Sequence, residues 1–215
     1  MSGALPRSNS NLSEDVYQQL RRDIVHGVLR PNEGLVEVEI AERLGVSRTP
    51  VRESMQRLAD DGLIVSKRRR WVVYEHSPAE VAELYGVRAA LESHAARLAA
   101  QTMSDEQRRA LEEMREEVTS SKLEGLARVD VNEHFHDFVS QASGNRRLAT
   151  LIKRTRLYHF NTRVAALYTP DDLAVSAEQH GALIEALLEQ DVEAAGRVAR
   201  EHVEYALELI LRKLY

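Results

Sequence analysis

The sequence predicts a mainly α-helical protein, with an N-terminal winged helix–turn–helix followed by an all-α helical bundle. Three observations support this fold class. Glycine and proline divide the first 76 residues into short segments. From Ser77-Pro78 onward, apolar residues instead repeat with long helical periods. Aromatic residues make up 5% of the 215 residues, so the later helices must pack mainly through Ala, Leu and Val.

Three short helices and two strands are expected in the first part. Val16, Leu20 and Ile24 recur at i, i+4 and i+8 and so share one face of the first helix. Gly45-Val46 forms a tight turn between the second and third helices. The expected elements are a helix ending near Gly27, helices over about 38–44 and from Ser47 to Gly62, and strands over 63–66 and 71–75 around a basic tip at 67–70.

The second part is expected to consist of six helices. Ser77-Pro78-Ala79-Glu80 has serine at an N-cap position and proline at the first helical position. Ser104-Asp105-Glu106-Gln107 has the spacing of a capping box, and Thr169-Pro170 marks a further start. The expected helices cover residues 78–101, 104–121, 124–143, 145–168, 171–189 and 191–213.

These patterns divide the chain into three parts. We expect a disordered tail over 1–11, the winged helix–turn–helix over 12–76 and the bundle over 77–215. The N-terminus lacks the apolar core of a signal peptide, and no apolar run approaches the ~20 residues of a membrane span. We therefore expect a cytoplasmic protein with no membrane partner.

Charge is distributed unevenly along the chain. The formal net charge is −5, from 29 basic and 34 acidic residues. Residues 1–76 carry a net charge of +1 and the remainder −6, whereas eight basic and three acidic residues lie between Arg43 and Arg70. A basic patch on an acidic protein is the electrostatic footprint of a nucleic-acid-binding surface. The total charge therefore does not argue against a domain that binds DNA.

The start of the third helix has the composition of a DNA-recognition helix. Ser47 occupies the N-cap, where free amide groups and the helix dipole attract a phosphate. Arg48 and Arg52 lie one turn apart on one face, whereas apolar residues such as Val51 face the core. Arginine binds guanine bidentately in the major groove, and the tip at 67–70 suits a phosphate backbone or a minor groove. The alternative is a solvated basic face.

Residues 12–75 resemble the DNA-binding domain of the GntR family of bacterial transcription regulators. The resemblance is carried by Leu29-Arg30-Pro31, by the segment from Leu44 to Glu53 that contains Ser-Arg-Thr-Pro-Val-Arg-Glu, and by the segment from Leu58 to Ile64. It implies a dimer that binds short palindromes, with DNA contacts from Ser47, Arg48, Thr49 and Arg52. The tip adds Arg68, Arg69 and Arg70. Two positions that are usually glycine in the family differ: Asn32, and the wing stretch Arg69-Arg70-Trp71.

Four polar residues of the bundle have the spacing of a metal site. His180 and His202 would lie ~33 Å apart on one straight helix. A turn at Gln190-Asp191 brings them to the same level, because His180 lies 10 residues before that turn and His202 lies 11 after it. Asn132 and His136 share one face of another helix. For each histidine alone, a surface or satisfied buried side chain is the alternative.

The chain contains no cysteine, so any metal must be held by histidine and oxygen. Three imidazoles and one oxygen donor from facing helices suit Zn, Ni, Mn or Fe.

The bundle resembles the FCD effector-binding domain of the FadR-type branch of the GntR family, over about residues 80–212. The resemblance is carried by the segments 84–92, 132–136, 142–145 and 178–180 and by His202. Many members bind a metal through Asp or Asn, a histidine four residues later, and two later histidines. This implies a divalent metal, with Zn as the first choice, held by Asn132, His136, His180 and His202. Because Asn is neutral, the site lacks an anionic protein ligand, which leaves room for an anionic effector.

Arg88 is the main candidate for binding that effector. It lies on the first bundle helix among apolar residues, and its guanidinium group suits a carboxylate. An ion pair with Glu92 at i+4 is the alternative. Arg154 and His159 on the fourth helix are further candidates. Counted from a turn at Gly144-Asn145, however, His159 lies ~9 Å further along the bundle than His136.

Together these features predict a ligand-responsive transcription regulator, expected to be a repressor and not an enzyme. A small organic acid bound at a metal-containing pocket would control the affinity of a homodimer for its double-stranded operator. One alternative is a metal-sensing regulator in which the ion is the effector. Another is a metalloenzyme with an appended nucleic-acid-binding domain, which is disfavoured because no carboxylate has the spacing of a general base.

Overall fold

The computed structural model describes the whole chain except residues 1–8, 121, 123–124, 157–163 and 165–166. The described residues form two compact units, one ending at Glu75 and the other beginning at His76. This division lies one residue before the expected boundary after residue 76. Among the described helices, none combines the length and hydropathy of a membrane span.

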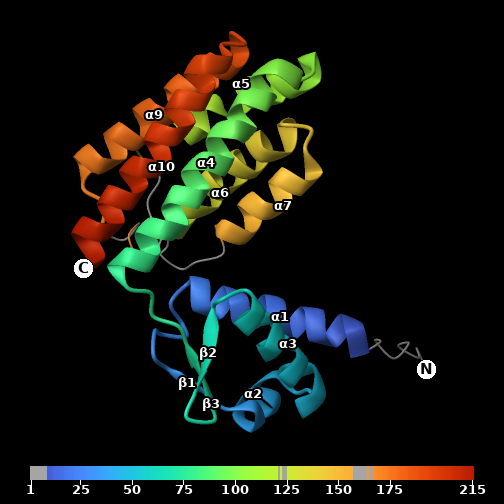
Figure 1. Ribbon diagram of the computed structural model, residues 1–215. Helices are drawn as coiled ribbons and strands as arrows, with labels where there is room; N and C mark the ends of the chain where they lie inside the picture. The colour runs from blue at the N-terminus through green and yellow to red at the C-terminus, as the bar shows by residue number, and fades with distance from the viewer. Residues whose placement is uncertain (1–8, 121, 123–124, 157–163, 165–166) are drawn as a thin grey trace. The chain divides into compact units, whose positions relative to one another are not determined.

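The first unit is a winged helix–turn–helix, as predicted (Figure 1). It contains α1 (Asn9–Val25), β1 (Gly34–Leu35), α2 (Glu37–Leu44), α3 (Arg48–Asp60), β2 (Ile64–Lys67) and β3 (Arg70–Val73). The three strands form an antiparallel sheet in the order β1-β3-β2. Leu20 of α1 packs with Met55 and Leu58 of α3, and all three are fully buried. Each such side chain stabilises the unit by about 1.5–3 kcal/mol, so the inner face of α3 is firmly held.

Two features of this unit differ from the prediction. Helix α1 begins at Asn9, so the last three residues of the expected tail over 1–11 are helical. The sequence analysis also missed β1. A strand of two residues has no periodicity to recognise, and its pairing of Gly34 with Val72 joins segments far apart in the chain.

The wing turns at two arginines with left-handed backbone angles. Arg68 has φ 53° and Arg69 has φ 65°, and together they connect β2 to β3. A left-handed conformation costs an L-residue about 1–2 kcal/mol, which glycine avoids. Asn32 also has a positive φ, 63°, but asparagine tolerates this region because its short side chain bonds locally. The tip therefore keeps two arginines where the backbone favours glycine.

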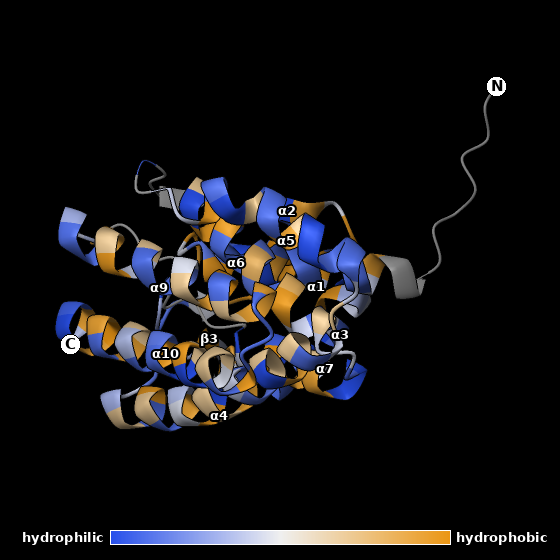
Figure 2. Ribbon diagram, turned by 90° about the horizontal axis from the view of Figure 1, so that it is seen from above, coloured by the Kyte–Doolittle hydropathy of each residue, from blue (hydrophilic) through white to orange (hydrophobic). Residues whose placement is uncertain are grey.

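The second unit is an all-helical bundle, as predicted. It contains α4 (Pro78–Thr102), α5 (Asp105–Val118), α6 (Gly125–Ala142), α7 (Arg146–Thr155), α9 (Pro170–Leu188) and α10 (Val192–Leu214). Capping boxes begin three of them, at Ser77 with Glu80, at Ser104 with Gln107 and at Thr169 with Asp172. Hydrophobic and hydrophilic residues alternate along α10 (Figure 2), the pattern of a helix that buries one face.

Small residues bring the helices of the bundle close together. Ala96, Ala99 and Ala100 of α4 share a buried cluster with Ala195 and Ala199 of α10. Helices α4 and α10 run side by side in Figure 1. This packing places the polar residues of α4 near those of α10.

The expected helix over 145–168 is wrong in extent. Helix α7 ends at Thr155, and residues 167–169 are not helical, although Val164 is. Neither glycine nor proline marks this break, so the sequence pattern did not reveal it. The capping box at Thr169 requires an extended backbone there (φ −83°, ψ 163°), which excludes a helix continuing up to α9.

Candidate functional site

Helix α3, the predicted recognition helix, presents the two arginines of its first turns to solvent. The side chains of Arg48 and Arg52 are 60% and 67% exposed, and both contact the Glu37 carboxylate of α2, at 3.5 and 3.0 Å. Thr49 is also exposed. Ser47 occupies the N-cap with an extended backbone, and its side chain makes no capping hydrogen bond. The first amide groups of α3 are therefore left for another acceptor, and Glu37 pre-orients the arginines beside them.

The wing tip adds a second basic surface. Lys67, Arg68, Arg69 and Arg70 are all exposed. The positive φ angles of the turn hold Arg68 and Arg69 at the end of the hairpin. The predicted DNA-contacting residues therefore lie on two exposed surfaces of the first unit, the start of α3 and the wing tip.

The bundle brings three histidines from three helices together. One nitrogen from each of His136, His180 and His202 lies within 4.8 Å of the others, and all three side chains are buried. The ring centres of His180 and His202 are 4.5 Å apart, in agreement with the residue count on either side of the turn at Gln190-Asp191. Ring separations of 5.0 Å and 5.5 Å connect His136 to His202 and to His180. Asn132, one turn before His136 on α6, faces an adjoining cavity.

Hydrogen bonds orient two of these rings. Nδ1 of His136 lies 3.2 Å from a carboxylate oxygen of Glu92, and Nδ1 of His202 lies 2.9 Å from Oε1 of Gln179. Both contacts require a proton on Nδ1, which leaves the Nε2 lone pairs available. Nε2 of His136 and Nε2 of His180 are buried without a hydrogen-bond partner among the described residues. Buried imidazole lone pairs held by such partners fit a divalent metal ion.

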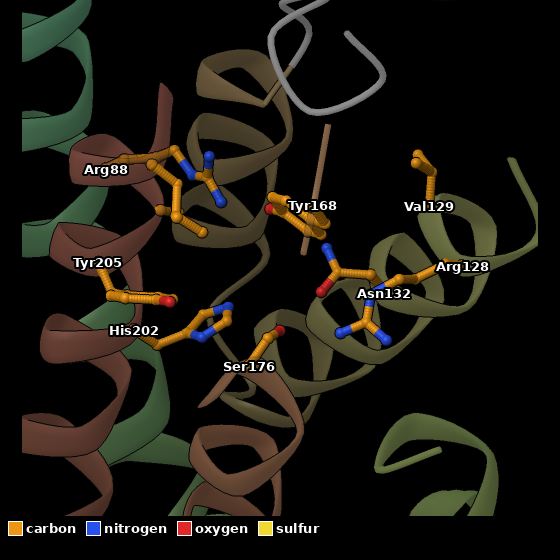
Figure 3. Close-up of a pocket in the computed structure, with 10 residues that line it drawn as sticks. Arg88, Arg128, Val129, Asn132, Tyr168, Ser176, His202 and Tyr205 are labelled. Carbon is orange, nitrogen blue, oxygen red and sulfur yellow. The ribbon is translucent and has the colours of Figure 1, made fainter. Parts of the chain in front are cut away.

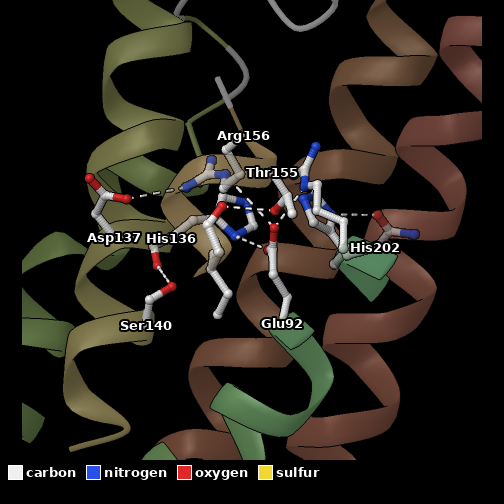
Figure 4. Close-up of polar contacts among 10 residues, drawn as sticks. Glu92, His136, Asp137, Ser140, Thr155, Arg156 and His202 are labelled. Carbon is white, nitrogen blue, oxygen red and sulfur yellow. Dashed lines mark hydrogen bonds and ion pairs between the residues drawn. The ribbon is translucent and has the colours of Figure 1, made fainter. Parts of the chain in front are cut away.

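Glu92 is the centre of a buried charge network that the sequence analysis did not predict (Figure 4). Its carboxylate lies 2.8 Å from Arg88 Nε and 3.8 Å from Arg156 Nε, in addition to its contact with His136. Arg156 also lies 3.6 Å from Asp137. Burial raises the pKa of Glu92, but the charge of Arg88 and the bond from His136 outweigh this and hold that pKa well below its usual range. An anion therefore lies directly beside the histidine cluster.

Acidification is expected to destabilise the metal-free bundle. Burial lowers the pKa of His136 to about 3, and lowers the pKa values of His180 and His202 well below 6.5. Below pH 6.5 the unfolded chain binds protons that the folded chain does not, so each histidine costs about 1.4 kcal/mol of stability per pH unit. At pH 5.5 the three together predict a loss of about 4 kcal/mol. Thermal unfolding of chelator-treated protein between pH 7.5 and 5.5 measures this loss, and a pH-independent bundle transition would contradict it.

A cavity of about 40 Å³, open to solvent, adjoins the histidine cluster. Its lining consists of Arg88, Arg128, Val129, Asn132, Tyr168, Ser176, His202, Tyr205, Ala206 and Leu209. Figure 3 shows Arg88, Tyr205 and His202 on one side, with Asn132 and Arg128 on the other. This volume holds a few water molecules and is smaller than the range of about 300–1,000 Å³ typical of small-molecule pockets, so lining side chains must move to admit an organic ligand. A ligand in the cavity would lie against His202, which belongs to both the lining and the cluster.

The effector candidates have different positions. Arg88 lines the cavity and also pairs with Glu92, so the two interpretations of this residue are compatible. Arg154 is exposed and does not line the cavity. Helix α7 turns Ile152 and Arg156 inward, and Arg154 lies about 200° around the helix from Arg156. His159 lies outside the described residues.

Four polar residues of the lining, Arg128, Tyr168, Ser176 and Tyr205, were missed by the sequence analysis. A signal for two of them existed. Arg128, Asn132 and His136 recur every four residues and so share one face of α6, and Ser176 lies one turn before His180 on α9.

Comparisons with known proteins give one family assignment for each unit. Residues 12–73 match the family model described as bacterial regulatory proteins, gntR family, and residues 83–205 match the model of the FCD domain. The uncharacterized HTH-type transcriptional regulator YdhC of Bacillus subtilis (strain 168) is 30% identical over 198 residues, which cover 89% of this chain and 88% of that protein. The HTH-type transcriptional repressor RspR of Escherichia coli (strain K12) is 29% identical over 205 residues, with coverages of 90% and 86%.

The solved structure of E. coli McbR/YncC has the same fold. It superposes with a TM-score of 0.80 over 95% of this chain and 99% of that chain, at 23% identity. The named curated relatives are transcription regulators and not enzymes.

Proposed function

The chain belongs to the GntR family of bacterial regulatory proteins and carries an FCD domain, and from this premise we propose that it is a metal-containing, acid-responsive repressor. Membership of the family establishes a DNA-binding transcription regulator, and the proposal concerns its metal, its effector and its operator. In it, a homodimer binds a palindromic operator, and a small organic acid in the bundle cavity controls the affinity for DNA. The observation that carries the proposal is the cavity that adjoins the buried histidine cluster. The repressor role is supported by the similarity to RspR, which is named a repressor.

The donor set supports a divalent transition metal in the cluster. Three neutral imidazole nitrogens suit Zn²⁺ first, with Ni, Mn or Fe as alternatives, and Asn132 is proposed as the oxygen ligand. Glu92 and Gln179 would fix the ring orientations of His136 and His202, as carboxylates and carbonyls do for most ligating histidines. When bound, the ion would supply a Lewis-acidic position for an oxygen of the effector.

The chain's own residues would bind and orient the acid. Arg88 lines the cavity and is held by Glu92 and by Tyr85, whose ring centre lies 4.7 Å from the guanidinium carbon. A pre-oriented guanidinium loses little freedom when it binds a carboxylate. Acid binding would thereby change the packing of α4 against α10, and with it the spacing of the two recognition helices in the dimer.

Exposed apolar side chains support the homodimer. Val87 of α4 is 53% exposed and Leu151 of α7 is 49% exposed. These two helices pack together through Ala95, Leu148 and Ile152. We place the contact with the second copy on this face, because exposed large apolar residues on adjacent elements favour association. A regulator that binds DNA is also expected in the cytoplasm.

The direct test is release of DNA from the full-length protein. Metal-loaded dimer is bound to a fragment that contains the promoter of its own gene, and a panel of organic acids is added. At least one acid is expected to release the fragment from the metal-loaded protein but not from chelator-treated protein. Release that follows metal concentration alone, with no acid effective, would favour the metal-sensing alternative. The two arginines in the cavity lining, Arg88 and Arg128, favour an organic acid as the effector, because an ion sensor needs no groups that bind an anion.

A substitution in the wing turn is expected to change stability and DNA affinity in opposite directions. Replacing Arg69 by glycine is expected to raise the stability of the first unit by about 1 kcal/mol, because glycine adopts the positive φ without strain. The same change is expected to weaken DNA binding and to reduce its salt dependence by about one phosphate contact in each half-site. Thermal unfolding and binding titrations at several salt concentrations measure the two effects. An increase in both stability and DNA affinity would show that Arg69 does not contact DNA.

A further inference from the structure

Arg128 is a buried cation that faces the cavity and has no carboxylate partner among the described residues. The residue is 7% exposed, and its guanidinium lies in the cavity wall. Its one hydrogen bond among the described residues is a long one of 3.3 Å, from Nη1 to the backbone oxygen of Ser120. No carboxylate of the described part of the chain lies within 4.0 Å of it. A buried charge in this state is costly unless a ligand neutralises it.

No other charged group of the described cavity lining neutralises Arg128. The charge of Arg88 is balanced by Glu92 at 2.8 Å, and the described cavity lining contains no Asp or Glu. Glu92 lies beside the cluster, but it also pairs with Arg88, so a divalent ion there would still leave excess positive charge next to the cavity, at a point separate from Arg128. A ligand with one negative group could neutralise only one of these two centres.

The two centres lie at different places along the cavity. Arg128 and His136 are eight residues apart on α6, which corresponds to a rise of about 12 Å along the helix axis, with Asn132 midway between them. In Figure 3 Arg128 lies beside Asn132, across the cavity from Arg88 and His202. A ligand that reaches both centres therefore needs acidic groups at its two ends.

We propose that the effector is a short-chain dicarboxylic acid, with one carboxylate bound by Arg128 and the other bound at the wall formed by Arg88 and His202. This inference rests on the proposed function and specifies its ligand. Between the two ends, the Ser176 hydroxyl and the Asn132 amide also line the cavity. These groups suit a hydroxyl or keto oxygen on the carbon chain between the carboxylates.

The test compares acids of equal chain length that differ in the second carboxylate. The pairs are succinate with butyrate, malate with 3-hydroxybutyrate, and 2-oxoglutarate with 2-oxopentanoate. Affinities for the metal-loaded full-length protein are measured by calorimetry. At least one dicarboxylate is expected to bind about 10- to 100-fold more tightly than its partner, the contribution of a charge-assisted hydrogen bond to a carboxylate.

Variants assign the difference to Arg128. Arg128→Gln is expected to lower the affinity for the dicarboxylate to that of the monocarboxylate and to leave the monocarboxylate unchanged. Arg128→Lys, which keeps the charge, is expected to retain part of the preference. Arg154→Gln removes an exposed arginine outside the cavity and is expected to change neither affinity. Because Arg128 has no ion pair in the described residues, its replacement is not expected to lower the unfolding temperature of the ligand-free protein.

Several outcomes would overturn the inference. They are equal affinities within all three pairs, a dicarboxylate preference that survives in Arg128→Gln, and no binding of any of the three dicarboxylates. Metal content and DNA binding are measured on the same preparations. Loss of either one, with the dicarboxylate preference intact, would contradict the proposed regulatory function and leave the ligand assignment standing.

Discussion

Replacing His180 by alanine is expected to abolish stable metal binding by the bundle. His180 contributes one of three clustered imidazoles, and its Nε2 atom is buried without a hydrogen-bond partner among the described residues. Loss of one nitrogen ligand leaves two histidines and the weak amide donor of Asn132. Because disturbing an outer hydrogen-bond partner alone costs about 10- to 100-fold in metal affinity, loss of a ligand should cost at least that much. Elemental analysis of purified protein after dialysis measures the effect.

His134→Ala is the matched control for this experiment. His134 lies on α6 two residues before His136, but it faces outward and is exposed. The His134→Ala variant should retain the metal content of the unmodified protein. Full metal occupancy in His180→Ala would refute the proposed site. A metal-free protein that still releases DNA in response to an acid would instead separate the effector from the ion.

Replacing Arg52 by alanine is expected to remove specific operator binding while the first unit stays folded. The side chain is 67% exposed, so its loss leaves the apolar core of α3 intact. A bidentate contact from arginine to a base contributes about 1–3 kcal/mol of discrimination, and a dimer loses two such contacts. The ratio of specific to non-specific affinity should therefore fall by about 30-fold or more, as measured by titration with operator and scrambled DNA.

Arg200→Ala provides a charge-matched control. Arg200 is an exposed residue of α10, so this variant has the same change in net charge without touching the recognition helix. Arg48→Ala should behave like Arg52→Ala, because both arginines contact the same Glu37 carboxylate. Unchanged discrimination in both arginine variants would remove the start of α3 from the DNA interface.

Local signals in the sequence predicted most of the secondary structure. Ser77 with Glu80, Ser104 with Gln107 and Thr169 with Pro170 correctly indicated three helix starts, because a capping interaction spans only a few residues. The proximity of His180 to His202 was also predictable, because a short turn between two helices relates positions by simple counting. Strand β1 was not predictable, because a distant strand determines it, and the end of α7 at Thr155 was not predictable, because neither glycine nor proline marks it.

Predictions about the bundle site depended on how far apart its residues lie in the chain. Asn132 and His136 share a face of α6 by spacing alone. The position of Glu92 beside His136 could not be predicted, because it depends on how α4 packs against α6, 44 residues later in the sequence. The same limit applies to Arg128: its helical face follows from spacing, but the absence of a carboxylate partner among the described residues does not.

The sequence by itself therefore determined the family, the two-part organisation and the exposed arginines of the recognition helix, since all of these follow from local motifs and helical periodicity. Tertiary structure alone decided the charge of the candidate site. The sequence indicated a metal site with neutral ligands, and the fold adds the Glu92 carboxylate on one side and, on the other, the Arg128 guanidinium, which no described carboxylate neutralises. Electrostatic interactions depend on distances through space and on burial, and only the packing of the helices determines either.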